Sequence, residues 1–277
     1  PDQATVRRAL ERAEFVVVQE AFSTTATCAY ADLLLPATTW GEKEGTVTNS
    51  ERRISRVRAA VAAPGQARAD WAIAADLGQR LAVALGRPQD ARLMNYPSPE
   101  SVWNEHREST RGRDLDITGL SYALLDVAPQ QWPAPDSAPT DALPQTVGKA
   151  RLYTDGIFPT ADGRAQFANV AYHPVAEPRE ARYPFALNTG RLRDQWHGMS
   201  RTGTLGRLFG HAREPALQMH PQDMARRLLK EGDLVHVTSR RGTIMVPVQA
   251  SAEQAMSQVF LAMHWGEEFI SGVGAGG

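Results

Sequence analysis

Apolar residues in the first part of the chain alternate between helical spacing and short continuous runs. Val6, Leu10 and Ala13 recur at helical spacing, and the apolar run 15–18 that follows is typical of a buried strand in a parallel sheet. A second apolar run, 31–36, ends at a proline. A helix followed by buried strands predicts an α/β layer, in which ligands bind beyond the carboxyl ends of the strands.

Residues 46–57 alternate around Asn49 and Ser50, which predicts two short strands or one strand with an irregular loop. Asp70 stands where a helix should begin, either as its N-cap or as an acid in its first turn. Gly86 and the proline that follows predict the end of this helix. The face expected to be buried carries Trp71, Ala74, Gly78, Leu81 and Leu85.

Proline-rich patches interrupt the pattern between residues 95 and 172. Ser98 and Pro99 predict the start of a helix that runs through His106, because serine caps a helix and proline suits its first turn. We expect the remainder to be a long connector that drapes over the upstream domains and ends in a β-hairpin. His106 and His173 lack the spacing of metal ligands.

Strand patterns dominate the last part of the chain. An apolar run at 185–187 predicts one strand, and His220 is expected to open a helix. The apolar side of this helix carries Met224, Leu228 and Leu229. Further strands are expected at 234–238, 244–248 and 259–263, with a turn at 240–242.

Length, charge and composition limit the number of domains and the kinds of partner that the chain can have. With 277 residues the chain has room for about two domains, and its net charge of -1 gives no general attraction to nucleic acid or to an anionic membrane. No apolar run approaches the roughly 18 residues of a membrane span. Cys28 is the single cysteine, which we interpret as a small buried filler. Because the chain starts abruptly at Pro1 and stops in a glycine-rich run, we expect it to be a fragment.

The stretch 187–203, LNTGRLRDQWHGMSRTG, concentrates the groups best suited to bind a ligand. Thr189, Gly190 and Arg191 place a hydroxyl, a bare backbone and a guanidinium at the exit of a strand. Glycine permits close approach to the main chain, and arginine offers a planar fork of donors for phosphate or a carbonyl-rich ring. The alternative is a polar surface loop with an ordinary turn glycine.

This stretch resembles the start of the C-terminal cofactor-binding domain of the molybdopterin oxidoreductases, the dimethyl sulfoxide reductase superfamily. T-G-R, a short spacer and W-H are similar to the nitrate reductase pattern, and 193–203 looks most like the cytoplasmic assimilatory branch. The segments ADLLLPA, EKEG and NSERR add a second signature. The resemblance extends from about Phe15 to Gly277 and is weakest between about 130 and 150.

The resemblance implies an α/β fold with three parts. A partial Rossmann-like layer, the C-terminal part of a molybdopterin-binding domain, spans 1–90. An irregular connector with short helices spans 91–180. A six-stranded double-psi β-barrel that binds the molybdopterin dinucleotide spans 181–277 and is truncated at its C-terminus.

The resemblance also implies a function. The chain would be the C-terminal part of a nitrate reductase catalytic subunit, a cytoplasmic enzyme of nitrate assimilation that reduces nitrate to nitrite. Its cofactor would be molybdenum bis(molybdopterin guanine dinucleotide), and its partners nitrate and an electron-donor protein or reductase subunit. The molybdenum ligand and the cysteines of a 4Fe-4S iron–sulfur cluster belong to a more N-terminal segment in this family. We therefore expect this chain alone to be inactive.

Two other functions stay open. A formate dehydrogenase of the same superfamily would carry a different loop after Trp-His. A double-psi barrel module without enzymatic activity would bind a nucleotide or a protein partner.

Residues from both ends of the chain would contact the cofactor by this resemblance. The assigned contacts are Gln19, Glu20, Lys43, Asp70, Thr189, Gly190, Arg191, Trp196, His197 and Trp265. Lys43 would face phosphate or a guanine carbonyl, and Asp70 would accept from the guanine amino edge. Met199 and Arg201 are assigned to the substrate funnel, and no residue is assigned as catalytic or as a metal ligand. We expect Arg191 and His197 at one mouth of the barrel, with Lys43 and Asp70 pointing to the same volume.

Structural alternatives accompany several of these assignments. Lys43 between two glutamates is also typical of a solvated lysine, and Asp70 is also suited to cap a helix. Trp265 would equally serve as a plug of the barrel, and Arg201 as a solvated arginine. The hydroxyls at 23–24 favour helix capping over direct ligand contact.

Overall fold

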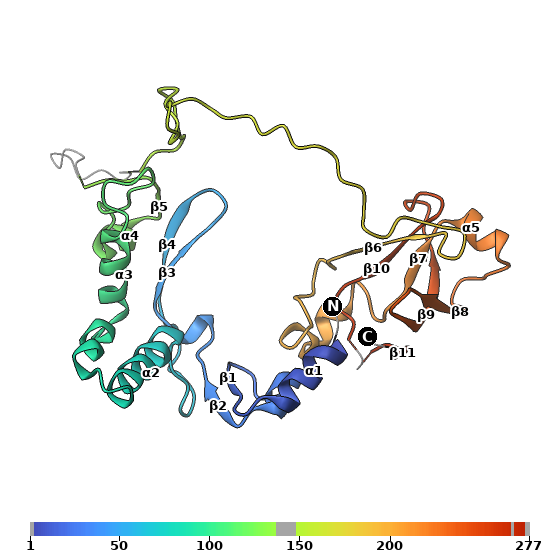
Figure 1. Ribbon diagram of the computed structural model, residues 1–277, viewed down its shortest axis with the longest axis horizontal. Helices are drawn as coiled ribbons and strands as arrows, with labels where there is room; N and C mark the ends of the chain where they lie inside the picture. Colours follow the sequence, from blue (N-terminus) through green and yellow to red (C-terminus); the bar gives the residue numbers. More distant parts are fainter. Residues whose placement is uncertain (1–2, 137–147, 267–268, 275–277) are drawn as a thin grey trace. The chain divides into compact units, whose positions relative to one another are not determined.

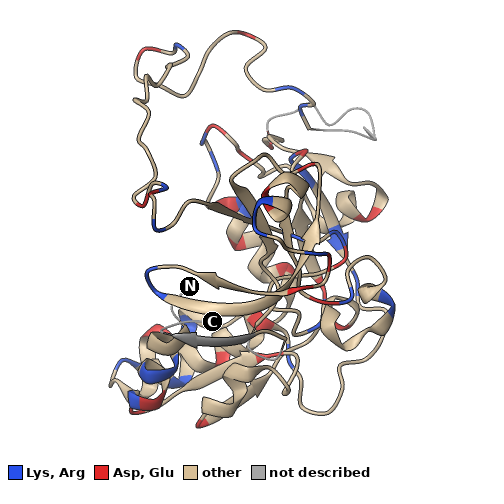
Figure 2. Cartoon of the chain, turned by 90° about the vertical axis from the view of Figure 1, so that its right-hand side faces the viewer, with Lys and Arg blue, Asp and Glu red and all other residues tan. Residues whose placement is uncertain are grey.

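The computed structural model describes residues 3–136, 148–266 and 269–274. The chain divides into two compact units. We call the unit formed by 1–18, 22–34 and 171–277 the sheet unit, and the unit formed by 19–21 and 35–170 the hairpin unit. Figure 1 traces the elements of each unit along the chain, and Figure 2 shows that acidic and basic residues are interspersed.

The hairpin unit is built on a small antiparallel sheet. Strands β3 (Gly45–Thr48) and β4 (Arg53–Val57) form a hairpin, and β5 (Gln130–Gln131) adds to β4. The Asn49 side chain accepts hydrogen bonds from the N–H groups of Glu51 and Arg53, at 3.0 Å each, and closes the turn. The two strands predicted around Asn49 and Ser50 are confirmed, because asparagine supplies the local turn chemistry.

The hairpin unit also contains four helical elements: α2 (Asp70–Ala84), η3 (Pro88–Met94), α3 (Pro99–Glu108) and α4 (Tyr122–Val127). Helix α3 packs on β3, α4 packs on β4, and α2 packs on η3. Ser98 caps α3 by accepting from the Ser101 N–H at 3.2 Å, so the predicted start of this helix is confirmed. In α2 the N-cap is Ala69 and Asp70 lies in the first turn, so the first-turn reading is confirmed over the N-cap reading. Gly86, with φ of 70°, follows its end as expected.

The buried face of α2 differs from the predicted one. Ile73 and Ala75 are buried, whereas Leu81 and Leu85 are exposed. The prediction was wrong because spacing identifies a stripe of apolar residues without identifying the neighbour that covers it. The neighbouring η3 reaches the predicted face at Gly78, where a Cβ would lie 2.9 Å from the Met94 side chain, but it leaves Leu81 and Leu85 exposed.

The segment 99–134 forms a core together with Ile54 of β4, which the sequence pattern did not indicate. Its buried members are Ile54, Trp103, Ile117, Leu120, Tyr122, Leu125 and Ala134. The Trp103 indole N–H donates to the Leu120 carbonyl at 3.1 Å. Over the described residues between 148 and 185 the structure has no extended strand, and the hairpin expected at the end of the connector is reduced to one isolated antiparallel bridge between Glu180 and Tyr183. Residues 137–147 of that connector lie outside the described residues.

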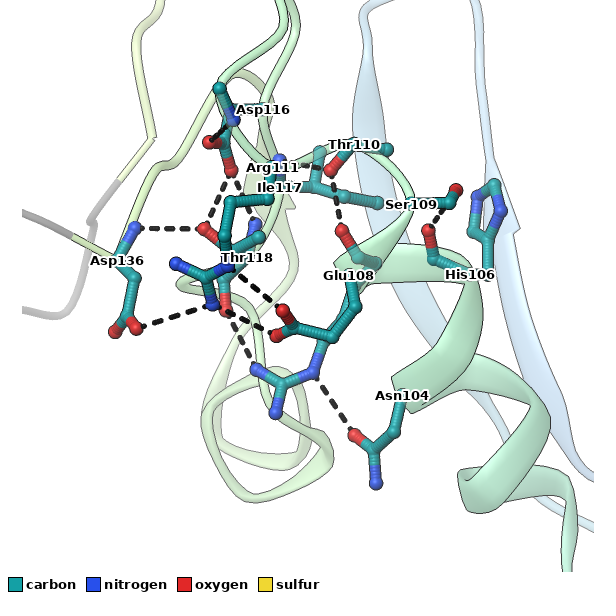
Figure 3. A network of polar contacts seen from close by, with 12 residues as sticks. Asn104, His106, Glu108, Ser109, Thr110, Arg111, Asp116, Ile117, Thr118 and Asp136 are labelled. Carbon is teal, nitrogen blue, oxygen red and sulfur yellow. Dashed lines mark hydrogen bonds and ion pairs between the residues drawn. The ribbon is translucent and has the colours of Figure 1, made fainter.

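A network of polar contacts holds the segment that follows α3 (Figure 3). The Asp116 carboxylate accepts from the N–H and hydroxyl of Thr118, at 2.8 and 2.6 Å, and from the Gly112 N–H at 2.8 Å. Burial raises the pKa of Asp116, but these hydrogen bonds outweigh it and hold the pKa below its ordinary value. The network satisfies a buried carboxylate and so has a structural role.

The sheet unit contains a mixed sheet of six strands. These are β6 (Ala186–Gly190), β7 (Leu217–Met219), β8 (Leu234–Thr238), β9 (Gly242–Ala250), β10 (Gln258–Ala262) and β11 (Ser271–Gly274). Their order is β11-β9-β7-β10-β6, with β8 also paired to β9. Strand β10 runs parallel to β6 and antiparallel to β7. The strands predicted from residue 185 onward are confirmed, and so is a mixed helix and sheet fold.

The core of the sheet unit lies on these strands and on α5 (Pro221–Arg226). Its buried members are Leu217, Met219, Met224, Val246, Val248, Val259 and Leu261. His220 opens α5 as predicted, since its side chain accepts from the Gln222 N–H at 3.1 Å. Leu228, however, is 89% exposed, because the helix ends at Arg226 and Leu228 has a φ of 59°.

The N-terminal elements form where predicted but are less buried than expected. Helix α1 (Gln3–Arg12) precedes β1 (Val17–Glu20) and β2 (Leu33–Pro36), which form a two-stranded sheet. Phe15 is 64% exposed, and Leu33 and Leu34 are also exposed, so the predicted burial was wrong. Apolar runs of this kind suit central strands, and this sheet has no central strand.

Between the two strands lies η1 (Ala26–Tyr30), with Thr25 rather than residue 23 or 24 at its cap position. Cys28 is partly exposed rather than buried, and its thiol donates to the Phe22 carbonyl at 3.7 Å. None of the helices in the described ranges has the length and apolar character needed to cross a membrane.

Candidate functional site

Three residues assigned from the sequence meet in the hairpin unit. The Gln19 side-chain amide donates to one carboxylate oxygen of Asp70 at 2.7 Å, and the Lys43 ammonium donates to the other at 3.0 Å. The partners lie 51 and 27 positions from Asp70 in the sequence. We call Gln19, Lys43 and Asp70 the carboxylate cluster.

Local structure brings these three side chains together. Lys43 follows η2 (Trp40–Glu42), which is closed by a capping box between Thr39 and Glu42. The Lys43 ammonium lies 4.7 Å from the centroid of the Trp40 ring. The N–H of Thr38 donates to the Arg68 carbonyl at 3.0 Å, which fixes the segment before η2 beside the segment before α2.

The carboxylate cluster is accessible and charged. The side chain of Asp70 is 54% exposed and that of Lys43 is 23% exposed. Desolvation raises the pKa of Asp70, but the hydrogen bonds from Lys43 and Gln19 outweigh it and lower the pKa below its ordinary value. Asp70 is therefore an ionised acceptor, flanked by an ammonium and an amide that both donate.

Glu20 is the next residue in β1 after Gln19. Its carboxylate accepts from the N–H of Ala21 at 2.7 Å, so one of its interactions is with its own turn. Its contact with the cofactor stays a prediction.

A second group of assigned residues forms in the sheet unit, in the segment 191–199 that follows β6. The guanidinium carbon of Arg191 lies 4.9 Å from the centroid of the Trp196 ring. The Trp196 and His197 rings meet edge to face, with centroids 4.6 Å apart and planes at 86°. Trp196 thus lies between Arg191 and His197, and we call residues 191–199 the aromatic loop.

The strand before the aromatic loop is fixed by its partner. Gly190 pairs with Ala262 in parallel register, and the Gly190 carbonyl accepts from the Met263 N–H at 3.0 Å. A Cβ on Gly190 would lie 3.2 Å from the ring of Phe260, so packing also favours glycine here. Thr189, one position earlier, is exposed.

His264 was missed by the sequence reasoning. His264 is 1% exposed, and its two ring nitrogens contact the aromatic loop at positions 192 and 197. Nε2 accepts from the Leu192 N–H at 2.8 Å, and Nδ1 lies 2.6 Å from the His197 carbonyl oxygen. The available signal was a histidine directly after the strand predicted at 259–263, beside the Trp265 that was singled out instead.

Trp265 packs inside the sheet unit. Its ring lies 5.4 Å from that of Phe269 and 6.4 Å from that of Phe209, and it shares a small core with Met199 and Ala262. This position agrees with the plug alternative for Trp265. Met199, assigned to the substrate funnel, is also buried. The guanidinium carbon of Arg201, the other residue assigned there, lies 5.8 Å from the centroid of the Phe22 ring.

Two further observations concern the described residues. A cavity of about 460 Å³ in the hairpin unit is lined by β3, β4 and α3, with Trp103, His106 and Trp132 among its walls. It includes none of the assigned residues. In the described part of the chain, no group of three or more His, Cys, Asp and Glu side chains is arranged to hold a metal ion.

Comparison with known families separates the two groups into two matched segments. Residues 1–80 match the model of the molybdopterin oxidoreductases, and residues 185–276 match that of the molydopterin dinucleotide binding domain. The carboxylate cluster lies in the first segment, and the aromatic loop with His264 lies in the second. The chain belongs to the molybdopterin oxidoreductases. The family predicted from the sequence is confirmed, and so is a molybdopterin dinucleotide as its cofactor class.

Individual members of this family match nearly the whole chain. It is 38% identical over 278 residues to a nitrate reductase of Klebsiella oxytoca, covering 97% of this chain and 30% of the relative. It is 34% identical over 267 residues to the alpha subunit of a formate dehydrogenase of Methanocaldococcus jannaschii, covering 96% of this chain and 37% of the relative. The chain thus spans about a third of the length of these relatives.

A solved structure supports the fold. Acetylene hydratase from Pelobacter acetylenicus aligns with a TM-score of 0.61 at 16% sequence identity, over 94% of this chain and 34% of that one. This similarity concerns the fold alone.

Proposed function

We propose that this chain binds the guanine dinucleotide ends of molybdenum bis(molybdopterin guanine dinucleotide) in an assimilatory nitrate reductase. One observation carries the proposal. Gln19, Lys43 and Asp70, each assigned from the sequence to cofactor contact, share direct hydrogen bonds although they lie far apart in the chain. The fold thus brings two donors from distant segments to the Asp70 carboxylate.

The donor set of the carboxylate cluster suits a guanine nucleotide. Guanine presents two adjacent N–H donors beside a carbonyl oxygen, and an ionised carboxylate accepts such a pair of donors. Lys43 beside Asp70 supplies an ammonium for the carbonyl or for phosphate. Because the side chain of Asp70 is 54% exposed, the ligand can exchange with the existing ion pair without opening a core.

The aromatic loop supplies the second set of contacts. The Arg191 guanidinium lies over the Trp196 ring, and its planar fork of N–H donors suits phosphate oxygens. Thr189 and Gly190 lie at the same strand end, and His197 completes the group. These assignments use the same residues that the resemblance selects.

The remaining parts of the proposal concern the whole enzyme. The molybdenum cofactor, when bound, supplies the two-electron chemistry by which nitrate gives nitrite and water. This chain's residues bind and orient the cofactor, and Arg201 attracts the nitrate anion. A 4Fe-4S cluster outside this chain, an electron-donor protein or reductase subunit, and a cytoplasmic location complete the assignment.

The proposal also includes the domain plan. The mixed sheet is assigned the connectivity of a double-psi barrel within residues 181–277. Residues 1–90 are assigned to the molybdopterin-binding α/β domain, and 91–180 to the connector. The pairing of β10, parallel with β6 and antiparallel with β7, gives the mixed sheet from which such a barrel would be built.

Formate oxidation is the second candidate function, because a formate dehydrogenase subunit is also similar over nearly the whole chain. Higher identity to a nitrate reductase, 38% against 34%, favours nitrate. A binding module without enzymatic activity remains the alternative from another class.

The test uses the natural full-length protein, produced in a host that makes the cofactor. Molybdenum is measured by elemental analysis, and nitrite is measured with reduced viologen and nitrate. We expect molybdenum and nitrite production, with formate leaving the oxidised dye unreduced. Formate-dependent dye reduction without nitrate reduction would establish the second candidate, and a protein without molybdenum would establish the binding module.

A further inference from the structure

The aromatic loop has an unusual backbone at its centre. His197 has a φ of 45° and Met199 a φ of 60°, both in the left-handed region that residues with a Cβ adopt infrequently. Such backbone persists where surrounding contacts hold it in place. The contacts on this loop therefore identify what maintains its conformation.

His264 makes two of these contacts, and their chemistry fixes its protonation. The Leu192 N–H can only donate, so Nε2 of His264 must be the acceptor and carry no hydrogen. The His197 carbonyl can only accept, so Nδ1 must carry the hydrogen and donate it. A neutral imidazole in one tautomer thus bridges positions 192 and 197.

We infer that His264 is a positioning residue for the cofactor-binding loop. It holds the aromatic loop in its left-handed turn, so that Arg191, Trp196 and His197 are arranged before the dinucleotide binds. The inference rests on the proposed function of this loop. His264 does not touch the cofactor in this assignment, because it is 1% exposed and lies behind the loop backbone.

Burial gives these two hydrogen bonds their importance. Without the imidazole, a backbone donor and a backbone acceptor would lose their partners in the protein interior. The loop would regain partners by opening toward water, which disorders the residues between 192 and 197. The expected result is a faster loss of the dinucleotide from the protein.

Three substitutions in the natural full-length protein separate the contacts. His264→Phe keeps a ring of similar size and removes both hydrogen bonds. His264→Asn places an amide N–H near the position of Nδ1 and retains the donor to His197. His264→Gln places an amide oxygen near the position of Nε2 and retains the acceptor for Leu192.

His220→Phe is the matched control, because His220 is another histidine of the sheet unit that accepts a backbone N–H. Two rates are measured for each variant. One is the loss of molybdopterin guanine dinucleotide, followed by pterin fluorescence in the filtrate. The other is trypsin cleavage after Arg191 and Arg193, followed by mass spectrometry.

For His264→Phe we expect both rates to rise about 10- to 100-fold, because two buried backbone groups lose their partners and each loss corresponds to a factor of roughly ten. The Asn and Gln variants should each recover part of the difference, and His220→Phe should match the wild type. Phe variant rates equal to those of the wild type would overturn the inference. So would Asn and Gln variants that behave no better than Phe.

If the Phe variant does not fold, the Asn and Gln variants decide, and wild-type rates in both would overturn the inference. A failure of the proposed function gives a different result. In that case the wild-type protein carries no molybdopterin dinucleotide, while the trypsin cleavage rates still test whether His264 holds the loop.

Discussion

The carboxylate cluster and the aromatic loop present ligand-binding groups in opposite ways. In the carboxylate cluster, side chains from distant segments bind one another, and the central Asp70 side chain is 54% exposed. In the aromatic loop, the backbone is fixed from behind by an imidazole that is 1% exposed. The first site already contains its own ion pair, whereas the second has its backbone arranged in advance.

This difference determines what a ligand must do at each place. An exposed ion pair contributes about 0–1 kcal/mol to stability, so a ligand displaces the Lys43–Asp70 contact at small cost. The aromatic loop requires no such exchange, because its ordering cost is met on folding. Substitutions should therefore act on ligand exchange in the cluster and on loop order in the second site.

The largest expected effect concerns the chain by itself. Both sites are made of groups that hold a cofactor, and the one thiol, Cys28, is engaged with Thr25 and Phe22. We expect the isolated chain to purify colourless, without molybdenum or iron, and to form no nitrite with reduced viologen. Dye-linked nitrite production together with stoichiometric metal would contradict this expectation.

The next effect tests the carboxylate cluster. Asp70→Ala and Lys43→Ala in the natural full-length protein should each lower affinity for the dinucleotide about 10- to 100-fold, as expected for charge-assisted hydrogen bonds. Molybdenum content after purification is the measurement. Asp76→Ala is the control, since Asp76 lies in the same helix and pairs at 2.8 Å with Arg68 and Arg80. Equal molybdenum content in all three variants would remove the cluster from the site.

A smaller effect tests the aromatic loop. Arg191→Lys keeps the charge but loses the planar group that lies on Trp196, so dinucleotide loss should become about two- to fivefold faster. Arg193→Lys is the matched control, because Arg193 pairs with Asp194 at 2.8 Å and lies in the same loop. A larger effect at 193 than at 191 would reverse the assignment of the two arginines.

The smallest effect is the pH dependence of the Asp70 ion pair. The folded-state pKa of Asp70 is below its ordinary value of 3.8, so its contribution to stability is complete well above pH 3.8 and is lost as the pH falls through the lowered pKa. Exposure keeps this contribution below about 1 kcal/mol. The free energies of unfolding of the wild type and Asp70→Asn should converge at acid pH, and a difference that widens there would contradict the assignment.

Local chemistry explains which elements could be predicted from the sequence. Ser98 before Pro99 specified the start of α3, and Asn49 specified the β3–β4 turn, because each acts within three or four residues. The exposed Leu228 and the buried face of α2 were predicted wrongly. Their environments depend on where a helix stops and which neighbour covers it, and apolar spacing does not contain that information.

In the candidate site, too, the sequence identified single residues but not their contacts. Motif resemblance selected Gln19, Lys43 and Asp70 one by one, and only the fold shows that they share hydrogen bonds. His264 has no motif spacing relative to Leu192 or His197, since its contacts lie 72 and 67 positions away. A buried side chain that serves the backbone of another segment leaves little trace in the sequence pattern.

The parallel pairing of β6 and β10 fixes the length of the two segments that follow these strands, from Gly190 to Leu192 and from Ala262 to His264. Gly190 is opposite Ala262, and Leu192 and His264 each follow two positions later. A residue inserted into either segment would shift the positions that follow it to the opposite face and separate the His264 imidazole from the Leu192 N–H. Insertions should therefore be tolerated in the turn at 252–256 between β9 and β10, and excluded from positions 191 and 263, whatever residue is inserted.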